Sequence, residues 1–558
     1  MGEENGSQPR ETSRETRREA LGGQSDAARP WTAFATPLIG KAVRGASRLL
    51  RHGGSAFPGK IVEQIDPGFL ARTLADLPYG VVLVSGTNGK TTTTRMVASM
   101  LETLGLKVFT NPTGSNFTRG VVSALLTEVP LSGRLDADVA VLELDEAYAV
   151  KFVQQVKPRF ALLLNVMRDQ LDRFGEIDNT ARLLERVAEA TTGTVVLNRE
   201  DPRIARFASA VPEGTGVRYF GLAPELRRFF PSDDDMQTTV AEEAASVAGN
   251  GRPSANDRAQ QEPAGTSVSA EAPDADGREA TADVTLIRVG NHEADFLIDG
   301  QAVHTAVKLE GVYNLFNAAA ALATVRAVMA QDIASAQVAE TVPAETVPGQ
   351  ASHASDAAIS DESPVDSPVD HDRLLAALAE VTPAFGRGET IAVNGSDVQL
   401  LLVKNPMGFR LSLGSFPPDG HDTMIAICDL YADGRDMSWL WDVDFTSLRP
   451  TGVAMVSGTR AWDMALRLEY DQVRVEQTGT DLEAAVRQFV TARPGVPKHI
   501  YCTYTSMLRV RAELAKLGKA NGYGKSDRRD VPLPEGHEHL RGLRQRAGGS
   551  APAGTVRV

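Results

Sequence analysis

The residues best suited to chemistry stand together in VVLVSGTNGKTTTTRM, residues 81–96. The apolar run that opens this stretch predicts a buried parallel strand, followed by a glycine-bounded turn and a helix. Backbone N–H groups in such a turn, the helix dipole and the ammonium of Lys90 all attract phosphate. The hydroxyl of Thr91 can reach a magnesium ion. The stretch therefore predicts a phosphate-binding loop, and the alternative is an ordinary glycine-rich turn between a strand and a helix.

The spacing of this loop differs from that of the common P-loop. The consensus places four residues between its first glycine and the Gly-Lys pair, and Val84 occupies that first position here. The first glycine is instead Gly86, which gives the shorter loop G-T-N-G-K-T. The residues predicted to hold the phosphates are Gly86, Thr87, Asn88, Gly89, Lys90, Thr91 and Thr92.

Polar residues follow the neighbouring predicted strands. The strand in DVAVLELDEAY ends at Glu143, and the strand in RFALLLNVMRDQLD ends near Asn165 and Asp169. Ligands of open parallel sheets bind outside the carboxyl ends of the strands, so we expect these side chains to gather near the phosphate loop. The alternatives are a solvated strand end for Glu143, and capping of the next helix by Asp169 and Asp172.

Alternating strand and helix signals over 558 residues predict an α/β protein of two or three domains. Segments that are polar and poor in aromatic residues predict disorder. The expected divisions are a disordered tail at 1–30, a central ATP-binding domain at 31–330 with a disordered insertion at about 232–282, a disordered linker at 331–371, a C-terminal α/β domain at 372–525 and a disordered tail at 526–558.

Two predicted helices bear on function. Residues 31–51 form a basic amphipathic pattern, which predicts either contact with anionic lipid or a core-packed helix with a solvated basic face. Residues 311–330, GVYNLFNAAAALATVRAVMA, predict a strong helix with Asn314 and Asn317 on its polar N-terminal edge. Asn317 is either a ligand-binding residue or an ordinary residue of that helix.

Composition limits the class of protein. The formal net charge of −14 argues against wholesale binding of nucleic acid. The two cysteines, Cys428 and Cys502, exclude a disulfide framework and a four-cysteine zinc site, and fit a reducing cytoplasm. The chain has neither a signal-peptide core nor an apolar run of about 18 residues. We therefore expect a cytoplasmic protein, with peripheral contact at the membrane as an open alternative.

Several motifs stand in the order typical of one family. SGTNGKTTTT, GSN at 114–116, the Glu143 strand end, NVMRDQLDRFGE, LNREDP, GVYNLFNAAAA and FGRGE together resemble the Mur ligase superfamily, from about residue 31 to 522 apart from the two insertions. LELDEAY, KNPMGF and DGRDMSWLWDVDF resemble its MurT branch, the synthetase subunits of lipid II isoglutaminyl synthase. The resemblance implies a Mur ligase-like central P-loop ATPase domain with a mainly parallel sheet, and a C-terminal Rossmann-like α/β ligase domain.

The chain also departs from the family pattern. Gln170 stands where most Mur ligases carry histidine in D-H-L-D, which alters the second metal site. Many MurT proteins insert a four-cysteine zinc ribbon in the middle domain, and this chain lacks those cysteines, so no zinc is expected. No clear equivalent of the carbamylated lysine of several Mur ligases is present.

The resemblance implies ATP-dependent amidation of the D-glutamate α-carboxylate of the lipid II stem peptide, through an acyl phosphate. Lys90 and the loop amides would hold the phosphates, and Thr91 and Glu143 would hold Mg²⁺. Asn317 would contact adenine, and Arg387 would reach a phosphate. Asn198 and Asp201 are weaker nucleotide candidates.

The nitrogen donor is implied in the same way. Both cysteines lie in apolar strand patterns that predict core positions, so the chain has no plausible glutaminase of its own. Ammonia would come from a separate GatD-like glutaminase subunit, to whose catalytic triad this chain would lend an acid. By resemblance that acid is Asp436, and the rivals are Asp433, Asp442 and Asp444. The alternative is an acidic turn that caps a helix at Ser438.

Two other functions stay open. The first is a Mur-type ligase that adds an amino acid, or a relative of folylpolyglutamate or cyanophycin synthetase, with no glutaminase partner. The second is a nucleotide-dependent scaffold with an inactive site.

Overall fold

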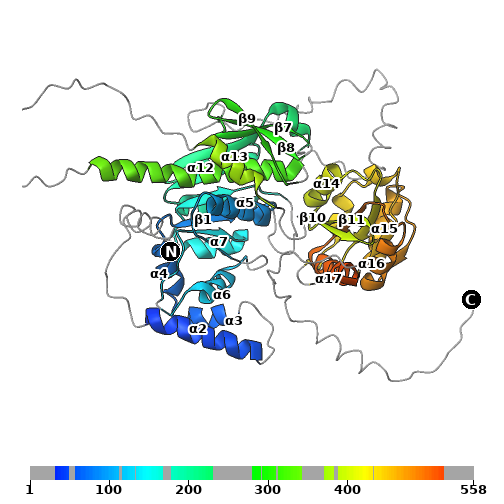
Figure 1. The fold of residues 1–558 in the computed structure, drawn as a ribbon, viewed down its shortest axis with the longest axis horizontal. Coiled ribbons are helices and arrows are strands. Elements are labelled where there is room, and N and C mark those ends of the chain that lie inside the picture. Colours follow the sequence, from blue (N-terminus) through cyan, green and yellow to red (C-terminus); the bar gives the residue numbers. More distant parts are fainter. Residues whose placement is uncertain are drawn as a thin grey trace, which may run out of the picture. The chain divides into compact units, whose positions relative to one another are not determined.

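A computed structural model describes eleven segments of the chain: residues 32–49, 57–111, 116–131, 133–167, 177–229, 280–290, 292–309, 312–341, 370–382, 387–430 and 433–520 (Figure 1). They fall into two compact units. The first comprises the described residues of Leu77–Thr110 and Ala137–Gly524, and the second those of Gln24–Asp76 and Asn111–Asp136. The predicted tails, and nearly all of the insertion at 232–282, lie outside the described residues.

A large sheet forms the N-terminal half of the first unit. Its described strands lie in the order β2-β3-β1-β4-β5-β6-β7-β8-β9. The first seven run parallel to one another, and the pairs β7–β8 and β8–β9 are antiparallel. The strands are β1 Val81–Ser85, β2 Val108–Thr110, β3 Val139–Glu143, β4 Phe160–Leu163, β5 Thr194–Asn198, β6 Gly216–Leu222, β7 Val284–Val289, β8 Glu293–Ile298 and β9 Gln301–Ala306. Strands β7 and β8 form an antiparallel hairpin, and the mainly parallel α/β class predicted from the sequence is confirmed.

Strand β1 lies at the point where the direction of the chain across the sheet reverses. The chain leaves β1 for β2 and β3 on one side and continues with β4 and β5 on the other. All five residues of β1 are buried, because parallel neighbours flank it and helices cover both faces. Such a reversal opens a crevice at the carboxyl ends of the strands, and the phosphate loop follows β1 at this crevice.

Helices cover both faces of this sheet. Val82 and Val84 belong to one apolar cluster with residues of α5, α12 and α13, while α7 contacts β1 and α9 contacts β4. The four consecutive alanines 318–321 of α12 are fully buried, which allows close packing on α5 and on the sheet. The helices are α5 Lys90–Thr103, α7 Glu146–Val153, α9 Ile177–Ala190, α10 Pro202–Ala205, η1 Arg206–Ala210, η2 Pro224–Phe229, α12 Val312–Thr341 and α13 His371–Ala379. Helix α12 thus continues to Thr341, past its predicted end at residue 330.

The C-terminal half of the first unit contains a second sheet, in the order β10-β11-β15-β12-β13-β14, parallel except for the β10–β11 hairpin. Separate apolar clusters pack on its two faces. Its elements are β10 Arg387–Val393, β11 Ser396–Leu402, α14 Pro406–Ser415, β12 Asp422–Ala426, η5 Ser438–Asp442, η6 Thr446–Leu448, β13 Met455–Ser457, α15 Ala461–Tyr470, β14 Thr478–Gly479, α16 Leu482–Thr491, β15 Lys498–Cys502 and α17 Tyr504–Ala520.

The second unit is helical, with α2 Thr32–Leu49, α3 Phe57–Ile65, α4 Phe69–Ala75 and α6 Thr118–Glu128. The predicted basic helix is α2, and Gly40 within it lies against the side chain of Leu126 in α6. Thr36 donates to Asp66 over 2.8 Å. These contacts favour the core-packed alternative for α2. Helices that combine the length and the apolar character needed to cross a membrane do not occur in the described segments.

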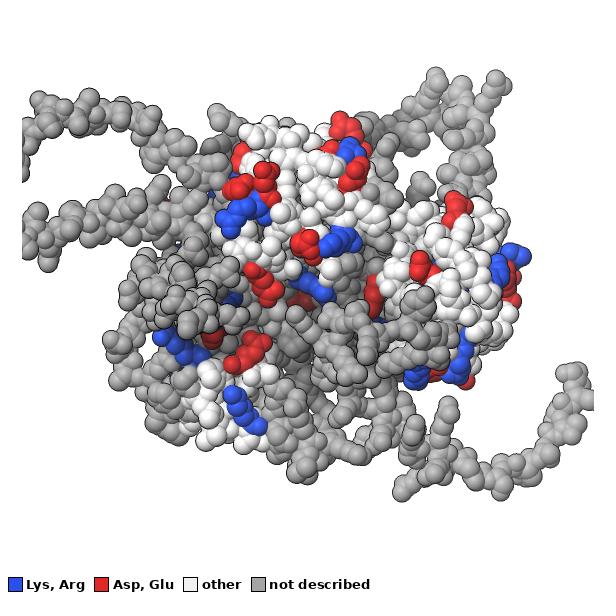
Figure 2. All heavy atoms as spheres, viewed as in Figure 1, with Lys and Arg blue, Asp and Glu red and all other residues white. Residues whose placement is uncertain are grey.

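Charged side chains of both signs are interspersed on the face of the molecule in Figure 2. The described part of that face has no broad basic patch of the kind that binds a nucleic-acid backbone.

Candidate active site

The loop between β1 and α5 depends on its two glycines. Gly86 has φ of 135° and Gly89 has φ of 85°, both in the region that side chains disfavour. A Cβ at Gly86 would lie 3.0 Å from the backbone N of Asn165, and one at Gly89 would lie 2.7 Å from Oδ1 of Asn317. The loop therefore sits close against two other polar segments, and any other residue at either glycine would push them apart.

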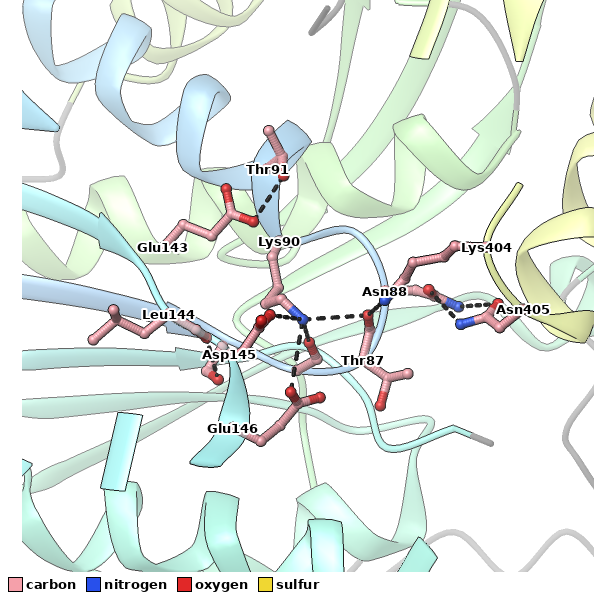
Figure 3. Close-up of polar contacts among 12 residues, drawn as sticks. Thr87, Asn88, Lys90, Thr91, Glu143, Leu144, Asp145, Glu146, Lys404 and Asn405 are labelled. Carbon is pink, nitrogen blue, oxygen red and sulfur yellow. Dashed lines mark hydrogen bonds and ion pairs between the residues drawn. The ribbon is translucent and has the colours of Figure 1, made fainter. Parts of the chain in front are cut away.

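Lys90 begins α5 and is buried, with 6% of its surface exposed (Figure 3). Its Nζ donates to the carbonyl of Gly86 over 2.6 Å and lies 3.1 Å from Oδ1 of Asp145 and 3.8 Å from Oε2 of Glu146. Burial raises the pKa of Glu146, and the Lys90 ammonium opposes that rise. The two acids follow β3, so the register of the sheet brings this cation and its counter-charges together at the phosphate loop.

Thr91 and Glu143 form the neighbouring contact. Thr91 Oγ1 donates to Oε1 of Glu143 over 2.8 Å, and both residues are buried. Glu143 is the last residue of β3 and pairs in register with Val84 of β1. A hydroxyl and a carboxylate are the oxygen ligands that Mg²⁺ prefers, so this pair fits the predicted metal site.

Asn165 is placed next to the loop, as its position after β4 predicts. Its Oδ1 accepts from the backbone N of Asn88 over 2.8 Å, and its Nδ2 donates to the carbonyl of Asn88 and to the hydroxyl of Tyr313, each over 3.1 Å. Asn165 thus fixes the backbone of the loop and connects it to α12. Asp169, Gln170 and Asp172 lie outside the described residues.

Asn317 lies on α12 beside the loop. Only 3% of its surface is exposed, and its buried Nδ2 has no hydrogen-bond partner among the described residues. A buried amide donor without a partner is costly. Asn317 also lines a pocket, and an adenine acceptor there would satisfy the amide, so this residue fits the predicted nucleotide. The other lining residues are Asn88, Gly89, Thr92, Tyr313, Asn314, Leu401, Leu402, Lys404, Gly408, Leu411, Ser412, Ser415 and Phe416.

Lys404 and Asn405, two residues of the site to which the sequence alone assigns no role, follow β11. Lys404 Nζ donates to the carbonyl of Thr87 over 2.9 Å, and the side-chain amides of Asn405 and Asn88 bond to each other (Figure 3). Both belong to the KNPMGF string. Asn405 carries the one local signal that could have indicated a role, an asparagine before proline at a helix start.

Three other predicted nucleotide residues have different surroundings. Asn198 and Asp201 hold the backbone: Asn198 donates to the carbonyl of Leu164, and Asp201 accepts from Val166 and caps α10. Both side chains therefore stabilise the local backbone. Arg387 begins β10, and its side chain lies outside the described part of the structure.

The acids of the DGRDMSWLWDVD stretch have distinct environments. Asp433 is buried and accepts from the backbone N atoms of Thr505, over 2.6 Å, and Leu430. Asp436 is half-buried, and the hydroxyl and amide of Ser438 hold its pKa below the usual range. Asp444 accepts from Thr446 N over 2.8 Å, and Asp442 is half-buried. Asp433 is therefore buried and holds backbone groups of the fold, whereas Asp436 is only half-buried and has a lowered pKa.

The thiols of both cysteines are buried in the core of the C-terminal domain. Cys428 and Cys502 have no exposed surface, and burial raises the pKa of Cys502 far above that of a free thiol. A thiol without access to solvent or thiolate character does not attack glutamine. The prediction that both are core residues is confirmed.

Two family models match the chain. One, described as the Mur ligase middle domain, matches residues 84–243, and the other, described as MurT ligase C-terminal, matches residues 402–507. The first covers the phosphate loop, and the second covers the site residues after β11 together with the acidic stretch.

Similar curated proteins cover most of the chain. The protein named lipid II isoglutaminyl synthase (glutamine-hydrolyzing) subunit MurT of Streptococcus pneumoniae is 28% identical over 84% of this chain and 94% of its own. The protein of the same name from Staphylococcus aureus is 25% identical over 80% of this chain and 89% of its own.

Solved structures agree in fold. MurF of Acinetobacter baumannii is 16% identical, with a TM-score of 0.51 over 83% of this chain and 80% of that chain. MurF ligase of Thermotoga maritima, in complex with ADP, is 14% identical, with the same TM-score over 82% of this chain and 85% of that chain. The loop, the strand-end acid and the C-terminal stretch thus occur in one chain in the expected order, on the expected fold. The chain thus carries a Mur ligase middle domain and a MurT-type C-terminal ligase domain.

Proposed function

We propose that this chain is the ATP-dependent synthetase subunit that amidates the D-glutamate α-carboxylate of the lipid II stem peptide to D-isoglutamine. One observation carries the proposal: a buried phosphate loop is combined in one chain with a MurT-type C-terminal domain. Two relatives that this chain matches over nearly their full length are named as subunits of a glutamine-hydrolysing lipid II isoglutaminyl synthase.

A carboxylate is a poor electrophile, so the reaction needs activation. ATP, the co-substrate, converts the carboxylate to an acyl phosphate, from which ammonia displaces phosphate. The work of the protein is to neutralise and orient charge. Lys90 supplies a buried positive charge at the loop, and the backbone N–H groups of residues 87–91 surround the phosphates. Asn317 positions the adenine through its amide Nδ2, which has no hydrogen-bond partner among the described residues.

Thr91 and Glu143 would hold Mg²⁺, which supplies charge neutralisation on the phosphate oxygens when bound. Their contact of 2.8 Å keeps both oxygens on one side of the loop. Arg387 is proposed to reach a phosphate when substrate is bound.

Ammonia is proposed to come from a GatD-type glutaminase subunit, because both thiols of this chain are buried. Asp436 would orient the histidine of that subunit and stabilise its cation, as the acid of a triad does. The low pKa of Asp436 suits this role, since the acid must be ionised. Lipid II is a membrane lipid, so the proposal implies that the enzyme acts on its substrate at the cytoplasmic face of the membrane.

The test is an amidation assay on the full-length chain with ATP, Mg²⁺ and lipid II. We expect amidation from ammonium by the chain alone, and from glutamine only when the glutaminase subunit is present. Lys90→Ala should lower both rates by about 10²-fold or more, as expected for loss of an electrostatic contact in the active site. Lys151→Ala, which removes an exposed lysine of α7, is the matched control.

The alternatives give different products. Addition of an amino acid in place of ammonia would identify an amino-acid-adding ligase, and the absence of ATP turnover would identify a scaffold. Either result would refute the proposal.

A further inference from the structure

Large apolar side chains line the exposed side of α15. Trp462, Leu466 and Tyr470 recur at every fourth position and are 67%, 50% and 59% exposed. The opposite side of the same helix buries Met464 and Leu468 in the core of the C-terminal domain. A surface helix normally carries polar residues on its outer face. In α15 the acids Asp463 and Glu469 are exposed as expected, but three large apolar side chains are exposed beside them.

This apolar side continues at both ends of the helix. At its C-terminal end, the ring of Trp441 in η5 lies edge-on to Tyr470, with 5.0 Å between centroids. Near its N-terminal end, Asp429 bonds to Thr459 and Arg460, which stand directly before α15, and the exposed Leu430 (37%) is the next residue after Asp429. We call Leu430, Trp441, Trp462, Leu466 and Tyr470 the α15 strip. It holds half of the ten large hydrophobic residues that are exposed in the described structure.

Buried charges hold the strip in place. Arg467 has no exposed surface and pairs with Asp471, with 2.7 Å between Nη1 and Oδ1. The same guanidinium lies 5.4 Å from the ring of Trp441 and donates to the carbonyls of Leu440 and Val443. The strip is therefore preorganised, and exposed tryptophan and tyrosine are the side chains most often found at the energetic centre of protein interfaces.

We propose that the α15 strip is the surface on which the glutaminase subunit docks, an inference that rests on the proposed function. The chain has no accessible thiol, so a second protein must hydrolyse glutamine. Leu430 and Trp441 lie on either side of Asp436 in sequence, so the strip and the candidate triad acid share one segment. A subunit seated on the strip would bring its catalytic histidine to Asp436.

The test compares two leucines of similar exposure. Leu466→Glu places a charge in the strip, and Leu131→Glu places one on an exposed leucine (57%) outside the C-terminal domain. Full-length variants are titrated with the GatD-type subunit of the same organism, and amidation is measured from ammonium and from glutamine. We expect Leu466→Glu to raise the Kd at least tenfold. The rate from glutamine should fall, recovering at high concentrations of the partner, while the rate from ammonium stays unchanged.

Unchanged affinity in Leu466→Glu, with the rate from ammonium intact, would overturn the docking proposal and leave the proposed function standing. The docking proposal also fails if the wild-type chain forms a homodimer that Leu466→Glu dissociates and Leu131→Glu does not. It fails as well if Leu466→Glu, and not Leu131→Glu, abolishes binding of the chain to vesicles that contain lipid II. If the wild-type chain gives no amidation from ammonium, the proposed function fails, and the binding titration still shows whether the strip binds this subunit.

Discussion

Asn88 and Asn405 donate their side-chain amides to each other's oxygens, over 3.3 and 3.0 Å, although 317 residues separate them in sequence. Asn88 lies in the phosphate loop, and Asn405 is the N-cap of α14, where its Oδ1 also accepts from Gly408 N over 2.8 Å. Asn405 is fully buried. A single side chain thus serves both the start of a C-terminal helix and the conformation of the loop.

Two substitutions at Asn405 separate these roles. Serine can cap α14 but is too short to reach Asn88. Alanine can neither cap the helix nor reach Asn88. We expect Asn405→Ala to lower stability by about 1 kcal/mol through the lost cap, and Asn405→Ser to stay near wild type. Both should raise the KM for ATP by about tenfold, because each leaves the buried amide of Asn88 without its partner. The measurements are thermal unfolding and ammonium-driven amidation.

If Asn405→Ser matches the wild type in both its KM for ATP and its stability, and only Asn405→Ala changes, then Asn405 acts only as the helix cap. Asn88→Ala should give no further loss in the Asn405→Ala background if the two residues act as a pair.

Asn317 offers a test in which binding and stability move in opposite directions. Its buried Nδ2 has no partner among the described residues, so the amide costs stability in the ligand-free protein. Asn317→Ala should leave the melting temperature unchanged or higher, while weakening the binding of ADP by about tenfold or more. Calorimetric titration with ADP and a thermal melt measure the two effects. A lower melting temperature with unchanged ADP affinity would identify Asn317 as an ordinary helix residue.

The elements of the site that sequence could predict are those with local signals. Lys90 follows a buried strand and a glycine turn, and Glu143 and Asn165 end strands whose neighbours are also parallel, so one edge of the sheet collects them. Lys404 has no such signal, because its contact with Thr87 depends on how two segments of the first unit meet in three dimensions. The ends of helices are also hard to predict, as α12 shows: its alanine-rich stretch continues in helical conformation well past the predicted end.

The pair formed by Thr91 and Glu143 makes a prediction about magnesium. Thr91→Ser keeps the hydroxyl and should retain most of the activity, whereas Thr91→Val keeps the shape and removes the ligand. We expect Thr91→Val to lower the rate by about 10²-fold at moderate Mg²⁺, since charge neutralisation at the phosphates is lost. Titration with MgCl₂ in the ammonium assay measures the effect. An identical Mg²⁺ dependence in Thr91→Val and in the wild type would remove Thr91 from the metal site.

Asp436 and Asp444 make matched variants, because each accepts a hydrogen bond from the backbone N two residues later, over 2.8 Å. Asp436→Asn should abolish amidation from glutamine and spare amidation from ammonium, while Asp444→Asn should spare both. Loss of both rates in Asp436→Asn would end the triad proposal.

The pH dependence of Asp436 follows from its lowered pKa. The pKa of Asp436 is lower in the folded chain than in the unfolded chain. Its ionised form therefore stabilises the fold at pH values above the pKa of the unfolded state. This stabilisation is lost as the pH falls through the pKa of the folded state. Around neutral pH the group is ionised. Ser438→Ala removes the hydroxyl donor, so the acid limb of the glutamine-dependent rate should move to higher pH, while the ammonium-dependent profile stays in place.

Arg467 should be a sensitive position of the C-terminal domain, because it is charged and fully buried. Arg467→Met leaves the carboxylate of Asp471 buried without its cation, and removing one partner of a buried pair costs about 3–5 kcal/mol. It also releases the carbonyls of Leu440 and Val443. Replacing both partners, with Arg467→Met and Asp471→Leu together, should recover part of the loss, since no isolated charge remains.

Tryptophan fluorescence suits this experiment, because Trp439, Trp441 and Trp462 lie in the C-terminal domain and only Trp31 lies elsewhere. If the double variant recovers stability yet binds the glutaminase subunit more weakly than the wild type does, the arginine contributes to docking as well as to folding. That outcome is expected because Arg467 stacks on Trp441 and holds the segment between η5 and Phe445. A double variant with normal stability and normal binding would show that hydrophobic packing alone can shape the α15 strip, and that the buried pair is dispensable for it.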